Sequence, residues 1–401
     1  MGALLVLMCS ELGVTFRLRT CRLPPSHLTP LASRLTLTPH APRLTLHASR
    51  LTPLDIRGTL PIVTHPAHIA GENQTMRAVR FASFGEPADV LTIENIPAPQ
   101  PGPGQVLVRV QVRPINPSDL FVIRGLYGTL PRLPAVPGFE GAGVIVGVGE
   151  GVTDRTIGQT VIPMGAAGLW QEYVVVPAAR AIPVPATIGD RQAATALVNP
   201  ATAWLMLTDT LRVEPGEWVL QNAANSIVGR HVIRLAQRLG FRTINVVRRR
   251  EVMDDLRTLG AGDIICEQDE NVVARVHALT GGKGVRYALD SVGGASGARL
   301  AASLAVGGTM LVYGAIAGEP LTIHPGTLLF RSATIRGWWL SHWLQTATPE
   351  QAQDLFTTLF GLIADGTLHT PIAAEYDLGD VREAVIAAEH KTRPGKVLLV
   401  G

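Results

Sequence analysis

The segment from Trp218 to Val247 constrains the fold more than any other part of the chain. The run WVLQ, 218–221, is short, apolar and typical of a buried strand. A turn follows, and a helix is predicted from about residue 227 to Gly240, a residue suited to a helix end. Its apolar residues recur at the spacing of one helical face: Val228, Val232, Leu235, Ala236 and Leu239. The next strand, TINVV, completes a strand-helix-strand unit.

Further strands of the same kind follow this unit. GVRYALD (284–290) and GTMLVYGA (308–315) are apolar runs between helical patterns. Strands that alternate with helices pair in parallel and have helices on both faces of their sheet. This part of the chain is therefore predicted to be α/β, a doubly wound nucleotide-binding sheet.

The preceding part of the chain has a different texture. In QVLVRVQV (105–112), valines recur at every second position, which indicates a half-buried strand. GVIVGVGEGV, GQTVIPM and WQEYVVVP follow, separated by glycine and proline, and they predict a compact domain like a β-barrel. At the other end of the chain, PGKVLLVG is predicted to be one last strand.

Residues 1–75 differ from all that follows Met76. The near-repeat SRLTLTPHAPRLTLHASRLTPL contains too much proline for regular helix or central strand, so we expect this segment to be disordered. One explanation is an upstream start assigned in error, with translation beginning at Met76. The other is a mitochondrial transit peptide, because the segment is rich in Arg and poor in acids. The protein would be cytoplasmic in the first case and lie in the mitochondrial matrix in the second.

Charge and cysteine content exclude several classes of function. Residues 76–401 hold 28 basic and 29 acidic side chains, so no nucleic-acid-binding stripe is implied. Cys266 is the one cysteine of this part, which excludes an internal disulfide there and a cysteine-rich zinc site. No apolar run reaches the length of a membrane span.

The turn QNAANSIVG lies where a dinucleotide fold has its phosphate loop. Only Gly229 remains of the usual glycines, so the fingerprint is poor, and an ordinary capped turn is the alternative reading. Asn222, Asn225 and Ser226 hold the other positions, and their side chains can donate to a pyrophosphate. A helix that begins near Ile227 adds main-chain donors and a favourable dipole.

Three arginines follow the second strand of this unit. An NAD enzyme usually has an acidic residue there for the ribose hydroxyls, whereas guanidinium groups bind a 2′-phosphate. Arg248, Arg249 and Arg250 therefore predict NADPH, with Arg248 as the preferred contact. The alternative for at least one of them is a solvated residue that starts a helix.

Several motifs together resemble the medium-chain dehydrogenase/reductase family and, more narrowly, its zinc-free 2-enoyl thioester reductases. They are INPSDLFVIRGLYG, LPAVPGFEG, LVNPATAW, VLQNAANSIVG, RTINVVRRR and RGWWLSHW. The resemblance implies a GroES-like β-rich catalytic domain, 76–197 with 346–401, and a Rossmann-type NADPH-binding domain, 198–345. It also implies a homodimer.

Metal-dependent members of the family hold zinc with a cysteine in the first motif and a histidine in a Gly-His-Glu segment. Here these places are Asn116 and Phe139, and neither side chain can replace a thiolate or an imidazole. The four clustered cysteines of the structural zinc lobe are also missing from residues 76–401. We therefore expect no metal.

The resemblance assigns the catalytic role to Tyr127 of GLYG. Hydride addition to an enoyl thioester leaves an enolate, and a neutral tyrosine can donate a hydrogen bond or a proton to it. Packing of the ring in the loop is the alternative. The family's cofactor contacts match these residues: Asn199, Asn225, Ser226, Ile227, Val228, Tyr313, Gly314, Ala315, Ile316, Trp338, Trp339, Leu340 and Lys396. For each of them, plain packing or solvation is the alternative; Lys396 in particular could be an exposed strand lysine.

The leading hypothesis is NADPH-dependent reduction of trans-2-enoyl thioesters on CoA or acyl carrier protein. Quinone reduction is the nearest alternative, and a non-catalytic protein that binds dinucleotide or RNA is a more distant one. Trp338, Trp339 and Trp343 are expected to line an apolar acyl pocket or to fill a domain interface. Asp119 and Glu140 are expected to form structural hydrogen bonds.

Overall fold

The computed structural model describes residues 74–390 and 394–401. The predictions for residues 1–73 lie outside the described residues. A strand begins at Thr75, the last residue of the segment that was predicted to be disordered. This strand, β1 (Thr75–Arg80), pairs with β2 (Thr92–Pro97) in an antiparallel hairpin that the sequence patterns did not indicate.

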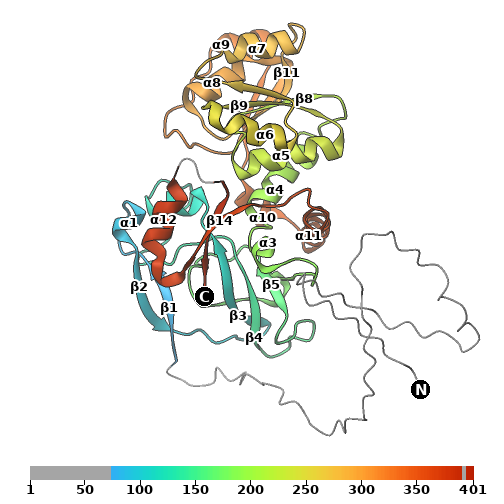
Figure 1. Cartoon of the computed structure of the whole chain (residues 1–401). Helices are drawn as coiled ribbons and strands as arrows, with labels where there is room; N and C mark the ends of the chain where they lie inside the picture. Colours follow the sequence, from blue (N-terminus) through green and yellow to red (C-terminus); the bar gives the residue numbers. More distant parts are fainter. Residues whose placement is uncertain (1–73, 391–393) are drawn as a thin grey trace, which may run out of the picture. The chain divides into compact units, whose positions relative to one another are not determined.

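A six-stranded parallel sheet holds the predicted strand-helix-strand unit (Figure 1). Its order is β10-β9-β8-β11-β12-β13, and every neighbouring pair is parallel. Its strands are β8 (Trp218–Gln221), β9 (Arg242–Val247), β10 (Asp263–Cys266), β11 (Val285–Asp290), β12 (Leu304–Val312) and β13 (Thr334–Gly337). The order reverses between β8 and β11, and ligands bind at the carboxyl ends of strands beside such a reversal.

Helix α5 (Ile227–Leu239) follows β8 as predicted, and local chemistry fixes both its ends. The Ser226 hydroxyl accepts a hydrogen bond from the main-chain N–H of Gly229 at 3.1 Å and caps the first turn. Gly240 ends the helix with φ +79°, a conformation that glycine adopts without steric cost. The predicted apolar face packs inward, since Val232 and Leu235 are fully buried.

A second, seven-stranded sheet contains the predicted strands of the β-rich part. The order is β14-β15-β3-β4-β5-β7, and β6 pairs with β3. Its strands are β3 (Gln105–Pro114), β4 (Ala142–Val148), β5 (Thr160–Pro163), β6 (Tyr173–Pro177), β7 (Ala181–Pro183), β14 (Ile372–Asp377) and β15 (Lys396–Val400). The predicted last strand, β15, runs antiparallel to β3, so residues 396–400 join the same sheet as residues 105–114.

The remaining elements connect and cover the sheets. They are α1 (Pro87–Val90), α2 (Pro117–Ile123), η1 (Ala178–Arg180), α3 (Asp190–Ala194), α4 (Val198–Leu205), η2 (Met206–Thr210), η3 (Arg250–Val252), α6 (Met253–Leu259), α7 (Val272–Leu279), α8 (Gly294–Ala302), α9 (Pro325–Arg331), α10 (Leu340–Thr346), α11 (Pro349–Ala364), η4 (Leu378–Asp380) and α12 (Val381–Glu389). Among the described residues, no helix combines the length and the hydropathy needed to cross a bilayer.

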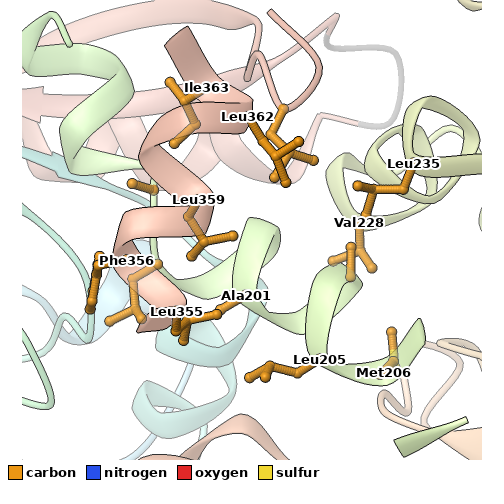
Figure 2. Packing of buried hydrophobic residues seen from close by; sticks show 14 of the residues in the cluster. Ala201, Leu205, Met206, Val228, Leu235, Leu355, Phe356, Leu359, Leu362 and Ile363 are labelled. Atoms are coloured by element: carbon orange, nitrogen blue, oxygen red, sulfur yellow. The ribbon is translucent and has the colours of Figure 1, made fainter. Parts of the chain in front are cut away.

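Helix α4 carries the chain from the seven-stranded sheet to the six-stranded one. Its residues Ala201 and Leu205 belong to a buried cluster with Val228 of α5 and with Phe356 and Leu359 of α11 (Figure 2). Interior packing of this kind resists changes of volume, so it holds α4 in a fixed position. The first turn of α4 contains Asn199, one of the predicted cofactor contacts.

Candidate active site

A cleft of about 1420 Å³ collects most of the predicted site residues. It includes residues at the carboxyl ends of β11 and β12 and the start of α5, which follows β8, where the strand order predicts a binding crevice. Thirteen predicted residues line it: Tyr127, Asn199, Ser226, Ile227, Val228, Tyr313, Gly314, Ala315, Ile316, Trp338, Trp339, Leu340 and Lys396. Such a concave site with few polar groups is typical of cofactor and substrate binding.

Five predicted residues do not line this cleft: Asn225, Gly229, Arg248, Arg249 and Arg250. The main chain at Gly229 packs closely against Ala224, because a Cβ at position 229 would lie 2.5 Å from the main-chain oxygen of Ala224. Asn225 and Arg248 are exposed, and Arg248 directly follows β9, the neighbour of β8. The guanidinium of Arg250 forms an ion pair with Asp269, with an N–O distance of 2.5 Å.

Tyr127 lies in the cleft with its hydroxyl held in place. The Trp339 indole Nε1–H donates to the Tyr127 hydroxyl oxygen at 2.8 Å. The tyrosine ring lies 5.5 Å from the Phe139 ring and meets the Trp339 ring edge-on at 5.7 Å, measured between centroids. Because the oxygen accepts from the indole, the phenolic proton remains available to a ligand.

The predicted absence of zinc ligands has a structural counterpart at Asn116. Its Nδ2 donates to the Glu140 carboxylate at 2.9 Å, and its Oδ1 accepts hydrogen bonds from Asn199 and from the Lys396 ammonium. The amide is therefore engaged by three side chains. Across residues 74–390 and 394–401, no three His, Cys, Asp or Glu side chains form a group that could hold a metal ion.

Lys396 faces this cluster from β15. Only 2% of the residue is exposed, so the reading of Lys396 as an exposed strand lysine is wrong. Buried ammonium groups require polar partners, and here the Asn116 amide oxygen and the main-chain oxygen of Ile115 accept from Lys396. The lysine lines the cleft and reaches the same amide as Asn199.

Two buried carboxyl groups support the cluster, as expected for Asp119 and Glu140. Asp119 accepts main-chain hydrogen bonds from Asn116 at 2.7 Å and from Phe139 at 3.1 Å. Burial raises the pKa of Asp119 to about 7, although these hydrogen bonds and the charge of Lys396 oppose the shift. Burial also raises the pKa of Glu140, which accepts from the main-chain N–H groups of Leu197 and Val198.

Tyr313 and Gly314 fit a bound cofactor. Burial raises the pKa of the Tyr313 hydroxyl to about 12, although the nearby side chains of Ser226 and Ser291 lower it slightly; no group of the described residues meets this hydroxyl with the geometry of a hydrogen bond. Buried polar groups normally have partners, so an unpaired hydroxyl at a cleft suggests a ligand. At Gly314 a Cβ would lie 2.6 Å from the main-chain oxygen of Ser291, so only glycine allows this close approach.

One polar residue of the predicted phosphate turn points elsewhere. The Asn222 side chain is buried, donates to Asp290 at 2.6 Å and accepts from the main-chain N–H of Ser291 at 2.8 Å. It links β8 to β11 and has no free donor for a pyrophosphate, so that part of the prediction is wrong. Asn116 and Arg180 also line the cleft. The sequence marked Asn116 only as the place of the missing zinc ligand, and no local pattern marks Arg180.

Comparison with known proteins decides the family. The profile described as alcohol dehydrogenase GroES-like domain matches residues 102–186, and that of zinc-binding dehydrogenase matches 228–358. The mitochondrial enoyl-[acyl-carrier-protein] reductase of Homo sapiens is 39% identical over 324 residues, which cover 80% of this chain and 87% of the relative. The Dictyostelium discoideum protein of the same description is 36% identical and covers 72% and 85%.

The chain belongs to the medium-chain dehydrogenase/reductases. Within them it falls in the 2-enoyl thioester reductase branch, as the motifs indicated. Its GroES-like part and its Rossmann-type parallel sheet agree with the predicted fold class. The chain is thus an oxidoreductase of a family that uses a nicotinamide cofactor of the NAD(P) type.

Solved structures of this family show the same fold. The Candida tropicalis mitochondrial 2-enoyl thioester reductase Etr1p/Etr2p heterodimer is 29% identical, with a TM-score of 0.71 over 82% of this chain and all of that one. Escherichia coli quinone oxidoreductase complexed with NADPH is 28% identical, with a TM-score of 0.76 over 81% of this chain and all of that one. Fold similarity alone therefore does not separate the two substrate classes.

Proposed function

We propose that this reductase uses NADPH to reduce the C2=C3 double bond of trans-2-enoyl thioesters carried on CoA or acyl carrier protein. The observation that carries the proposal is the Tyr127 hydroxyl, which accepts a hydrogen bond from Trp339 and keeps its own proton for the cleft. The curated relatives described as enoyl-[acyl-carrier-protein] reductases support the same substrate class.

NADPH held in the cleft would supply a hydride, and C3 of a thioester-conjugated double bond is the position suited to accept it. Negative charge then develops on the thioester oxygen, and the Tyr127 O–H donates a hydrogen bond to that oxygen. Saturation of the bond is completed by a proton at C2, from Tyr127 or from water. The neighbouring carboxyl groups of Asp119 and Glu140 are occupied by main-chain donors and by Asn116, so they hold the site rather than react.

The cofactor is proposed to bind mainly to residues of α5 and of the six-stranded sheet that line the cleft. The N-terminus of α5, at Ile227 and Val228, offers main-chain N–H groups and a positive dipole to a pyrophosphate. Tyr313 and Gly314, which follow β12, and Lys396 of β15 line the same cleft and would hold the cofactor there. The arginine run after β9 favours NADPH over NADH, with Arg248 as the first contact of the 2′-phosphate.

Quinone reduction remains the second candidate, favoured by the similarity to the Escherichia coli quinone oxidoreductase structure. The test is NADPH oxidation followed at 340 nm with a short trans-2-enoyl-CoA and separately with benzoquinone. Turnover of the enoyl-CoA supports the proposal. Turnover with the quinone alone contradicts it, and turnover with neither favours the reading as a non-catalytic dinucleotide- or RNA-binding protein.

Three expectations from the sequence stay proposals. The first is the domain division into 76–197 with 346–401 and 198–345, which is supported by the pairing of β15 with β3. The second is a homodimer, supported by the edge strand β13 and by the exposed side chains of Leu329 and Phe330 in α9, the helix that precedes it in the chain. The third is the compartment, matrix or cytoplasm; the relatives described as mitochondrial support the matrix.

A further inference from the structure

The loop 165–168, which follows β5, lines the cleft with main-chain N–H groups. Within the described residues, the main-chain N–H groups of Gly165, Ala167 and Gly168 donate to no other group. Gly165 and Gly168 have φ +68° and +77°, a turn conformation that favours glycine. Main-chain N–H groups that converge in such turns form concave sites for anions.

Arg180 adds a guanidinium group to this loop. It lines the same cleft and is exposed, and no acidic residue of the described chain forms an ion pair with it. A Cβ at Gly165 would lie 2.7 Å from Arg180 Nη1, so the guanidinium lies against the loop and the glycine leaves room for it. Lys396, the other Lys or Arg of the cleft lining, is buried and engaged by Asn116.

The loop lies close to Tyr127, on the side of the seven-stranded sheet. A Cβ at Gly168 would lie 3.4 Å from Val136, and Leu169 donates to the main-chain oxygen of Gly138 at 3.1 Å. Phe139, the next residue, packs on the Tyr127 ring. The proposed pyrophosphate site belongs to α5 beside the other sheet, so the loop lies at the part of the cleft that holds Tyr127.

We propose that Arg180 and the loop 165–168 bind a phosphate group of the carrier that holds the thioester substrate. The inference rests on the proposed function, because it assumes a thioester carried on a pantetheine arm. CoA and acyl carrier protein both attach this arm through a phosphate ester, which is an anion suited to a guanidinium and main-chain N–H groups. Simple quinones carry no such group.

The test compares substrates with and without phosphate in wild type, Arg180→Gln and Arg109→Gln. Arg109 is an exposed arginine of β3 outside the cleft lining and serves as the matched control. The substrates are one trans-2-enoyl group on CoA, on 4′-phosphopantetheine and on N-acetylcysteamine, which has no phosphate. In Arg180→Gln the ratio of the KM for the CoA thioester to that for the N-acetylcysteamine thioester rises about 10-fold or more, as expected for a lost charge-assisted hydrogen bond.

The substrate series also identifies the phosphate. A matching rise with the 4′-phosphopantetheine thioester supports the phosphate shared by CoA and acyl carrier protein, and a rise with CoA alone supports the phosphates of its nucleotide. An unchanged KM ratio overturns the inference, as does a rise in the KM for NADPH without a change in that ratio. Wild-type turnover of the N-acetylcysteamine thioester tests the proposed function separately, since it requires no phosphate contact.

Discussion

Replacing Tyr127 by phenylalanine removes one oxygen and leaves the ring in its place between Phe139 and Trp339. Trp339 is 38% exposed, so water can accept from its indole in the variant and the cost to folding is small. The substitution should instead lower kcat, because the phenol is the proposed hydrogen-bond donor to the developing enolate. Removing one such donor typically lowers kcat by about 10²–10³-fold. We expect that range for Tyr127→Phe.

The assay separates catalysis from binding and from folding. Steady-state kinetics with a trans-2-enoyl-CoA give kcat, NADPH fluorescence gives the Kd of the cofactor, and thermal unfolding gives stability. Tyr376→Phe is the matched control, because Tyr376 is half-buried against the same apolar cluster as Tyr127 and lies outside the cleft lining. A kcat within about threefold of wild type in Tyr127→Phe, with NADPH still bound, would refute the role of this hydroxyl.

Three further predictions use other parts of the structure. Arg248→Asp shifts the ratio of kcat/KM for NADPH to that for NADH towards NADH by about 10-fold or more, from the lost charge-assisted contact; an unchanged ratio contradicts the assignment. Lys396→Met leaves the Asn116 amide oxygen with one donor fewer and raises the KM for NADPH; equal KM values count against the cofactor role. Burial lowers the pKa of His231 to about 3, so the contribution of His231 to stability falls by about 1.4 kcal/mol per pH unit as pH decreases from about 6.5, where the unfolded state takes up a proton that the folded state refuses. Asp119 and Glu140, whose pKa values are raised by burial, act in the opposite direction, so the comparison of wild type with His231→Gln isolates this contribution. The difference in unfolding free energy between the two proteins, measured in urea at pH 7 and pH 5, should change by this slope; a difference that does not depend on pH contradicts the prediction.

The strand-helix-strand unit of the six-stranded sheet could be predicted because its signals are local. WVLQ became β8 with the predicted bounds, and the helix begins after Ser226 and ends before Gly240 as expected. The apolar run that predicts the strand, the repeat that predicts the helix and the glycine that ends it each depend on a few residues that are close in sequence. No distant contact is needed to interpret them.

Side-chain direction could not be predicted in the same way. Asn222 points to Asp290, a residue 68 positions away in the chain, and that partner decides its role. Lys396 lies on a strand whose two faces look alike in sequence, and burial against Asn116 became visible only in the fold. The donors of loop 165–168 were missed because an unpaired main-chain N–H has no signature in the sequence.

The most direct test of the central claim is the fate of hydrogen in a reaction run in D₂O with unlabelled NADPH and a trans-2-enoyl-CoA. If the Tyr127 site completes the reduction, mass spectrometry finds the saturated acyl-CoA with one deuterium, at C2, and with hydrogen from NADPH at C3. NADPH consumption by benzoquinone with no saturated acyl-CoA formed from the enoyl substrate would contradict the account.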